Sequence, residues 1–282
     1  MNIQNNIQKP IRRSKLRAKC GMLYYGALRR LLWISMGRKF ARVRREAPLA
    51  YQCFSHRTPL RRQLKDVDMW LQENKIINLK LATARIHGIL IRPGETFSYW
   101  RLIGKPSRRK GYAKGMVLRN GKFYAGTGGG LCQLSNMIFW MAAHSPLTVV
   151  ERHRHGYDVF PDSNRTQPFG SGATCYYPHG DLMLRNDTEH TFQILVTVGT
   201  DYLEGALLAS DPIPEKYCVV EKNHRMESEY WGAYSRHNEL HQEVYAPDGQ
   251  LLRSQLLVEN HALMMYSPFL DAAPTSFPEE KQ

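Results

Sequence analysis

The chain has 282 residues, of which 43% are hydrophobic, and a formal net charge of +14. This length is enough for one large domain or two modest ones with a proper core. The five cysteines are far apart and form no Cys-x-x-Cys pair, which argues against a zinc ribbon or a dense disulfide framework and fits a reducing compartment.

The positive charge is concentrated at the N-terminus. Residues 1–50 contain 13 Lys and Arg and one acidic residue, whereas the rest of the chain has 26 basic and 24 acidic residues. Large apolar residues recur in this arm close to helical spacing: Tyr24, Leu28, Leu31 and Ile34. The pattern predicts a basic amphipathic helix. An anionic membrane surface is the favoured partner and nucleic acid the least favoured, while docking of the helix on the body of the protein remains open.

No segment approaches the roughly 18 apolar residues that a transmembrane helix needs. Residues 20–28 are uncharged, but the stretch is short and is followed by Arg29 and Arg30. A signal peptide would need a longer apolar core and a small-residue cleavage site. We therefore expect a protein that is cytoplasmic or peripheral on the inner membrane face.

Helices dominate the predictions for the first half of the chain and strands those for the second. The elements predicted in the first half are a helix at 59–86, a strand at 89–91, a turn at 93–95, a hairpin at Asn120-Gly121 and a buried helix at 132–144. Further strands are predicted at 147–150, within 169–191, and at 192–198, 202–209, 217–221, 240–245 and 251–259.

These elements predict an α+β fold, in which N-terminal helices and a glycine-rich turn into a buried helix precede a half dominated by antiparallel sheet. We divide the chain into a basic arm at 1–55, a central domain at 56–210 and a β-rich extension at 211–282. The extension is expected to pack on the same domain.

The most informative segment reads Gly-Thr-Gly-Gly-Gly-Leu-Cys-Gln-Leu-Ser-Asn at 126–136. Its glycines permit a sharp turn and close approach of a substrate. Cys132 would then begin the buried helix, where free N–H groups and the helix dipole favour the thiolate. An acyl-transfer oxyanion could be held by the backbone N–H groups of Gly129, Gly130, Leu131 and Gln133. The segment therefore predicts a nucleophilic cysteine, the alternative being a buried structural one.

A second constellation, Glu151-Arg152-His153-Arg154-His155-Gly156-Tyr157, follows the strand predicted at 147–150. In an extended chain Glu151, His153, His155 and Tyr157 share one face. Either histidine could take the proton of the Cys132 thiol, and Glu151 could orient that histidine. We expect Ser135, Arg152 and Tyr157 to contact the substrate. The alternative is a solvated strand end.

Metal and nucleotide sites are weakly indicated. His153 and His155 are only two ligands, and in His237-Asn-Glu-Leu-His241 the glutamate is misplaced for a zincin helix. The glycines at 126–130 do not match a dinucleotide fingerprint. We therefore expect neither a metal nor a cofactor.

The chain resembles the VanW family. The resemblance is carried by Pro93-Gly94-Glu95-Thr96-Phe97-Ser98, Gly111-Tyr112, Gly128-Gly129-Gly130-Leu131-Cys132-Gln133-Leu134-Ser135, Glu151-Arg152-His153-Arg154-His155, Gly172-Ala173-Thr174 and the stretch from Asp181 to Asn186. It covers about residues 60–210. This family is associated with vancomycin resistance, and some of its domains are described as cysteine L,D-transpeptidases that cross-link peptidoglycan.

The resemblance implies that Cys132 attacks a carbonyl of a peptidoglycan stem peptide, releases the terminal D-residue and passes the acyl group to an amine. The expected partner is thus a stem peptide or a cell-wall precursor. A non-catalytic accessory protein that binds such a precursor, or a resistance enzyme, is the second hypothesis.

Overall fold

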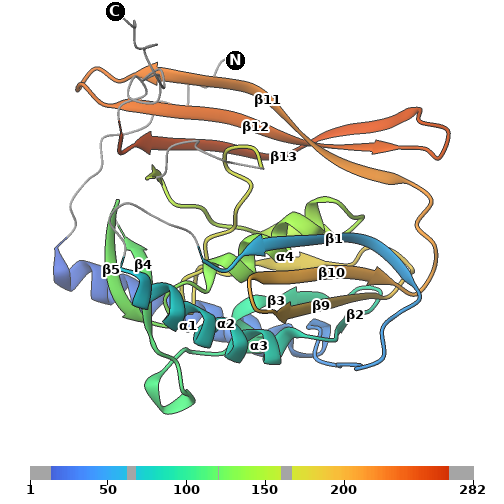
Figure 1. The fold of residues 1–282 in the computed structure, drawn as a ribbon, viewed down its shortest axis with the longest axis horizontal. Helices are drawn as coiled ribbons and strands as arrows, with labels where there is room; N and C mark the ends of the chain where they lie inside the picture. The colour runs from blue at the N-terminus through green and yellow to red at the C-terminus, as the bar shows by residue number, and fades with distance from the viewer. Residues whose placement is uncertain (1–13, 62–67, 120, 160–166, 267–282) are drawn as a thin grey trace, which may run out of the picture.

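A computed structural model describes residues 14–61, 68–119, 121–159 and 167–266 (Figure 1). Its helices are α1 (Lys15–Ser35), α2 (Met69–Ile86), α3 (Tyr99–Ile103) and α4 (Cys132–Ala143), with 3-10 turns at Gly37–Lys39 and Arg108–Lys110. The four helices precede most of the strands, so the predicted α+β class is confirmed. Among the described residues no helix combines the length and apolar character needed to cross a membrane.

The first sheet has the order β1-β10-β9-β2 and is antiparallel throughout. Its strands are β1 (Tyr51–Pro59), β2 (Ile89–Ile91), β9 (Phe192–Val198) and β10 (Tyr202–Ala209). Three of these match predicted strands. The fourth, β1, was not expected, and the helix predicted from residue 59 begins at Met69 instead. The reason is long-range pairing, because Thr58 and Pro59 lie opposite Leu203 and Tyr202 of β10.

The second sheet forms a separate layer from orange to red at the top of Figure 1. It contains β11 (Lys216–Ser228), β12 (Tyr234–Tyr245), β13 (Leu251–Met264) and the short parallel strand β7 (Tyr157–Asp158). Its three long strands extend well beyond the segments predicted for them. Each is continued by its antiparallel partner, since pairing satisfies the backbone along the whole ribbon.

Two smaller units complete the fold. The third sheet joins β3 (Thr96–Ser98), β8 (Met183–Arg185) and β6 (Thr148–Glu151), and a hairpin joins β4 (Lys114–Arg119) to β5 (Lys122–Thr127). The strands predicted within 169–191 reduce to β8 and an isolated bridge between Tyr176 and Gly180. The rest of that segment is irregular, and α4 contacts it directly.

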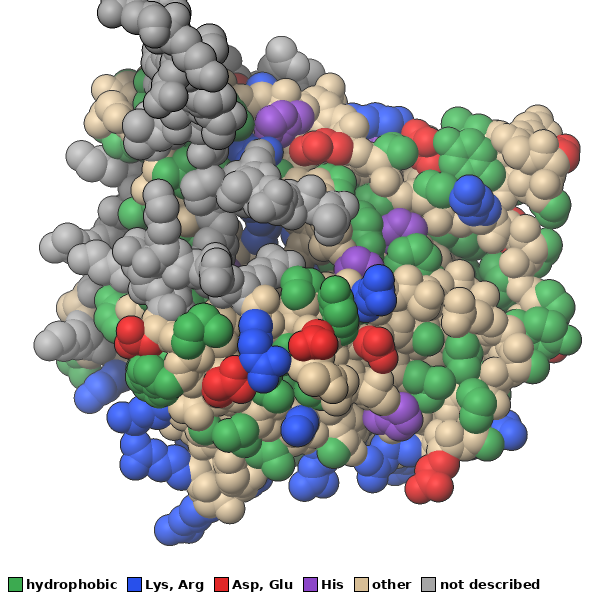
Figure 2. Space-filling model, in the orientation of Figure 1, with side chains coloured by type: hydrophobic (Ala, Val, Ile, Leu, Met, Phe, Trp, Pro, Cys, Tyr) green, Lys and Arg blue, Asp and Glu red, His purple; other side chains and the backbone are tan. Residues whose placement is uncertain are grey.

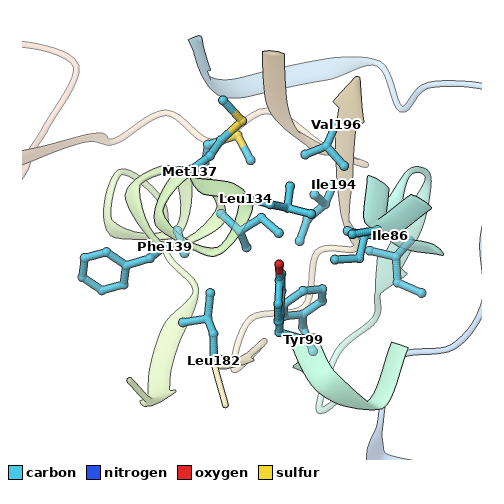
Figure 3. Packing of buried hydrophobic residues seen from close by; sticks show 14 of the residues in the cluster. Ile86, Tyr99, Leu134, Met137, Phe139, Leu182, Ile194 and Val196 are labelled. Atoms are coloured by element: carbon cyan, nitrogen blue, oxygen red, sulfur yellow. The ribbon is translucent and has the colours of Figure 1, made fainter. Parts of the chain in front are cut away.

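Helix α4 lies at the centre of the molecule, with nine of its twelve residues buried. Leu134 points from α4 towards Ile194 and Val196 of β9, and Phe139 points to the opposite side of the helix (Figure 3). A helix that is apolar all round needs contacts on every side. Accordingly, α4 contacts β1, β10, β6 and β11. This burial fixes the position of Cys132, the first residue of the helix.

Candidate active site

The turn before Cys132 is held by contacts between backbones. Gly130 has a positive φ of 88°, and Gly129 packs so closely on Gly115 of β4 that a Cβ atom would clash. Asn78 of α2 donates to the Gly129 carbonyl at 2.9 Å and also bonds the backbone of Ala113. At Gly129 the missing side chain therefore admits the β4–β5 hairpin rather than a substrate. In the sequence, Asn78 interrupts an apolar helical stripe, and this was the signal that it holds the turn before Cys132.

Cys132 is the first residue of α4, as predicted, but its thiol is not placed to ionise easily. Its Sγ lies 3.9 Å from the carbonyl oxygen of Cys175. Burial raises the pKa of the Cys132 thiol, and it raises that of Cys175 further, with the nearby Cys132 adding to the effect. This direction is opposite to the predicted effect of the helix start, because loss of hydration outweighs the backbone hydrogen bonds that lower the pKa of the thiol.

A short segment, residues 173–175, lies between α4 and the histidine-containing chain. Ser135 of α4 is fully buried and donates to the Ala173 carbonyl at 2.6 Å. Asn136 accepts from the Ala173 N–H at 2.8 Å, and the Thr174 N–H donates to the carbonyl of His153 at 2.8 Å. The structure thus uses Ser135, predicted to contact substrate, to hold this segment. It also places the start of α4 and His153 on either side of it.

Glu151 and His153 form a hydrogen-bonded pair beside this segment. His153 Nε2 lies 2.8 Å from Glu151 Oε1, and His153 Nδ1 lies 3.2 Å from the hydroxyl of the exposed Tyr176. Burial alone would raise the pKa of Glu151, but hydrogen bonds from His153 and Arg29 bring it below its usual value. Within the described ranges of the chain, His153 is the candidate histidine that a carboxylate holds, as the triad interpretation required of one of the two.

Arg29 of α1 reaches this pair from the N-terminal arm. Its guanidinium donates to Glu151 Oε1 at 2.5 Å and to the carbonyl of His179 at 2.8 Å, and only 8% of the residue is exposed. Sequence reasoning treated Arg29 as part of the charge of the arm. The sequence signal for this inward role was that Arg29 lies on the helix face opposite Leu23 and Leu31.

His155, Arg152 and Tyr157 have no hydrogen bond to the Cys132 thiol among the described residues. Burial and the neighbouring Arg154 lower the pKa of His155. Arg152 donates to the carbonyls of Gly170 and Gly172 and stacks 4.9 Å above the Phe139 ring, and burial lowers its pKa to about 10. Tyr157 pairs with Leu263 in the second sheet. In the described part of the chain no hydrogen bond joins Cys132 to His153 or His155.

The predicted oxyanion donors divide into two groups. The N–H of Gly129 already donates to Gly126 at 3.0 Å, and that of Gln133 to Gly130 at 3.1 Å. The Gln133 side chain bonds Thr58 and Pro59 of β1. The N–H groups of Gly130 and Leu131 therefore remain the better candidates for an oxyanion site.

Asp181, which the sequence analysis named only as part of the resembling stretch, is a further titratable group near this cluster. It is fully buried and accepts from Ser98 Oγ at 2.5 Å and from the N–H groups of Trp100 and Leu182 at 2.9 Å. Burial raises the pKa of Asp181 to about 6 despite these bonds. Its own N–H donates to Glu151 at 3.1 Å, which links it to the Arg29–Glu151–His153 cluster.

The described residues contain no group of three or more His, Cys, Asp or Glu side chains arranged to hold a metal ion. Of the histidines considered for such a site, His237 lies 2.6 Å from His261, and His241 lies 2.9 Å from Glu239. Both partners belong to the second sheet.

Comparison with known proteins gives two relatives and one family. The family model described as VanW like protein matches residues 74–208. The vancomycin B-type resistance protein VanW of Enterococcus faecalis (strain ATCC 700802 / V583) is 34% identical over 227 residues, 80% of this chain and 82% of that protein. The uncharacterized protein YoaR of Bacillus subtilis (strain 168) is 33% identical over 109 residues, 39% of this chain and 34% of that protein. No solved structure matches significantly.

Proposed function

The chain belongs to the VanW family, which is associated with vancomycin resistance, and from this premise we propose that it is a cysteine acyl-transferase of L,D-transpeptidase type acting on peptidoglycan stem peptides. The observation that carries the proposal is the pairing of Glu151 with His153 across residues 173–175 from Cys132. Nucleophilic catalysis requires a histidine that a carboxylate orients and that can reach the thiol, and Glu151 supplies the first of these requirements for His153.

Glu151 determines which nitrogen of His153 acts as the base. When Nε2–H donates to Glu151, Nδ1 carries the lone pair and accepts from the Tyr176 hydroxyl. Tyr176 is 43% exposed, so a substrate can displace its hydroxyl without disturbing the core. Because both ring nitrogens are occupied in the free protein, this displacement is the step that activates His153.

The proposed reaction has two acyl transfers. His153 Nδ1 accepts the proton of the Cys132 thiol, and Sγ forms a bond to the carbonyl carbon of the third stem-peptide residue. The C–N bond to the terminal D-residue then breaks, and that residue leaves as an amine that carries the proton from His153. An acceptor amine attacks the thioester, forms the new amide and restores the thiol. The N–H groups of Gly130 and Leu131 would stabilise both oxyanions.

The decisive experiment is intact-protein mass spectrometry of the full chain incubated with a synthetic stem tetrapeptide that ends in a D-residue. We expect a covalent adduct that has lost the terminal residue. Cys132→Ala should abolish this adduct, whereas Cys175→Ala, the matched change at the neighbouring thiol, should retain it. An adduct that survives Cys132→Ala, or none in the wild type, would overturn the proposal.

Alkylation of Cys132 against pH adds a second test. With the other four cysteines replaced by Ser, we expect the free protein to react with a midpoint above the ordinary value of about 8.5, because burial opposes thiolate formation. Addition of the stem peptide should lower this midpoint, and His153→Gln should remove that shift.

The raised thiol pKa and the engagement of Ser135 and Arg152 within the protein favour a second candidate. This is a non-catalytic accessory protein that binds a stem peptide or precursor. Under that function Cys132→Ala would leave both the binding of the tetrapeptide, measured by calorimetry, and resistance in cells unchanged.

A further inference from the structure

Helix α1 has an inward face that fixes its orientation on the protein. Gly26 is buried against Pro178, and Arg29 is buried in its contacts with Glu151 and the His179 carbonyl. Trp33 packs on the hydrophobic core, with its ring 6.3 Å from that of Tyr177. These three residues recur at intervals of three and four, so one stripe of the helix faces the body.

The opposite face of α1 is apolar and exposed. Its large residues repeat at helical intervals and are among the most exposed hydrophobic side chains of the described chain: Leu16 at 73%, Leu23 at 75%, Leu31 at 61% and Ile34 at 76%. Cys20 and Ala27 lie on the same stripe and are also exposed. In a monomeric protein such a continuous apolar stripe indicates an interaction surface.

Positive charge borders this stripe. Helix α1 contains no acidic residue, and Arg17, Lys19 and Arg30 are exposed beside the apolar stripe. Residues 1–50 carry 13 basic residues against Glu46 alone. On the face drawn in Figure 2, Lys and Arg side chains also lie along the lower edge of the molecule. Long basic side chains can rest their stems on apolar surface and present their charges to anionic groups.

We propose that the outward face of α1 binds the surface of an anionic lipid bilayer, with the helix lying in the interfacial plane. An apolar stripe bordered by Lys and Arg matches the acyl and headgroup layers of such a surface. The charge also decides against a second copy of this chain, because that contact would bring two strongly basic arms together. The apolar stripe does not fit nucleic acid, because phosphate groups make no favourable contact with leucine and isoleucine side chains.

Binding of this face of α1 to a bilayer would also bring the candidate site close to the membrane. Arg29 contacts Glu151 from the face of α1 opposite the stripe. The Glu151–His153 pair is thus separated from the bilayer by one helix, a thickness of about 10 Å. Membrane binding would place the site beside substrates attached to or emerging from the bilayer. The surface itself does not depend on the proposed function, and its test uses no enzymatic readout.

The test is flotation of the full-length protein with phosphatidylcholine vesicles, with and without phosphatidylglycerol. We expect binding only to the anionic vesicles. L23Q/I34Q should weaken it by roughly a hundredfold, because burial of each leucine-sized side chain is worth roughly a factor of ten. R17Q/R30Q should weaken it by about tenfold and reduce its sensitivity to salt.

The control is L251Q/L256Q, which replaces two comparably apolar residues on β13 that are 48% and 55% exposed. It should bind vesicles like the wild type, and circular dichroism should give all variants the same melting temperature. Equal binding by L23Q/I34Q and the wild type would overturn the proposal, as would equal flotation with neutral vesicles. A wild-type dimer in sedimentation that L23Q/I34Q converts to a monomer, without vesicle binding, would also overturn it and identify the stripe as a dimer interface.

Discussion

The two large sheets are joined to helix α4 by different forces. The first sheet meets α4 through apolar side chains such as Leu134, Ile194 and Val196, all in one buried cluster. The second sheet meets the end of α4 through Gln242, which donates to the carbonyls of Ala143 and Ser145 at 2.8 and 3.0 Å. The first interface is apolar, whereas the second adds side-chain hydrogen bonds to the packing of Leu257 and Val258 on the same cluster.

The polar character of the second interface continues beyond Gln242. Asn238 donates to the Phe169 carbonyl at 2.7 Å, and Asn260 donates to Asn238 at 2.8 Å. The guanidinium groups of Arg154 and Arg236 lie 3.8 and 4.5 Å from the Phe169 ring. Such a network costs free energy when one member is lost, because the remaining buried groups have no water to replace it. The comparison teaches that the two halves should respond differently to the same kind of substitution.

The largest effect is expected in the apolar interface. Leu134→Ala removes a fully buried side chain and should lower the free energy of unfolding by about 3 to 4 kcal/mol, from lost transfer energy and a residual cavity. Urea denaturation followed by circular dichroism measures this. Ile77→Ala on α2, where 46% of the side chain is exposed, is the control and should cost far less. Equal losses would mean that α4 is not packed as described.

Asp181 is a buried carboxylate in the half of the molecule that contains the first sheet, and its substitution tests how burial shifts its pKa. Its folded pKa of about 6 exceeds the value of 3.8 expected for the unfolded chain, so the folded protein binds the proton more tightly. This contribution is present below about pH 4 and is lost as the pH rises through 6. Asp181→Asn should therefore gain stability relative to wild type over that interval, by an amount of the order of 3 kcal/mol.

The measurement is the difference in free energy of unfolding between the variant and wild type at a series of pH values. Asp187→Asn is the control with opposite sign, because the hydrogen bond from Arg185 lowers the pKa of Asp187. At this position the wild type should become more stable than the variant as the pH rises above the lowered pKa of Asp187. Parallel stability curves for Asp181→Asn and wild type would contradict the assignment.

A moderate effect is expected in the polar interface. Gln242→Leu keeps a similar volume but leaves the carbonyls of Ala143 and Ser145 without their donor, at a cost of about 1 to 3 kcal/mol. Gln255 donates to Gln242 from an exposed position, so Gln255→Leu should cost less than half as much. Thermal unfolding of both variants checks the order. A neutral Gln242→Leu would show that the second sheet is held mainly by apolar contact.

The smallest effect is expected on the outer face of the second sheet. Leu256→Gln changes a side chain that is 55% exposed and should alter the free energy of unfolding by less than about 0.5 kcal/mol. Urea denaturation would measure it. A loss above about 1 kcal/mol would indicate that this face is covered in solution.

The elements with a clear local period could be predicted from the sequence. The strands at 192–198 and 202–209 match β9 and β10, and the buried helix matches α4 to within one residue. Strand β1 was missed because its conformation depends on pairing with β10, some 150 residues further along the chain. The lengths of β11, β12 and β13 were underestimated for the same reason.

In the candidate site, too, local features could be predicted from the sequence and long-range contacts could not. The position of Cys132 at a helix start follows from the glycine turn and the apolar stripe behind it, which are local. The pairing of Glu151 with His153 is also local, since only one residue separates them. The contacts of Arg29 with Glu151, and of Cys132 with Cys175, join segments that are remote in sequence, and no pattern along the chain encodes them.

The amino-acid sequence by itself determined the class of fold, the turn that presents Cys132, the family and the basic apolar helix of the arm. Only the tertiary structure decided which face of α1 is buried, that burial raises the pKa of the Cys132 thiol, and that Asp181 lies in the core. The physical reason is that helical and strand periods arise between neighbours along the chain. Loss of hydration and ion pairing arise between segments that meet only when the chain folds.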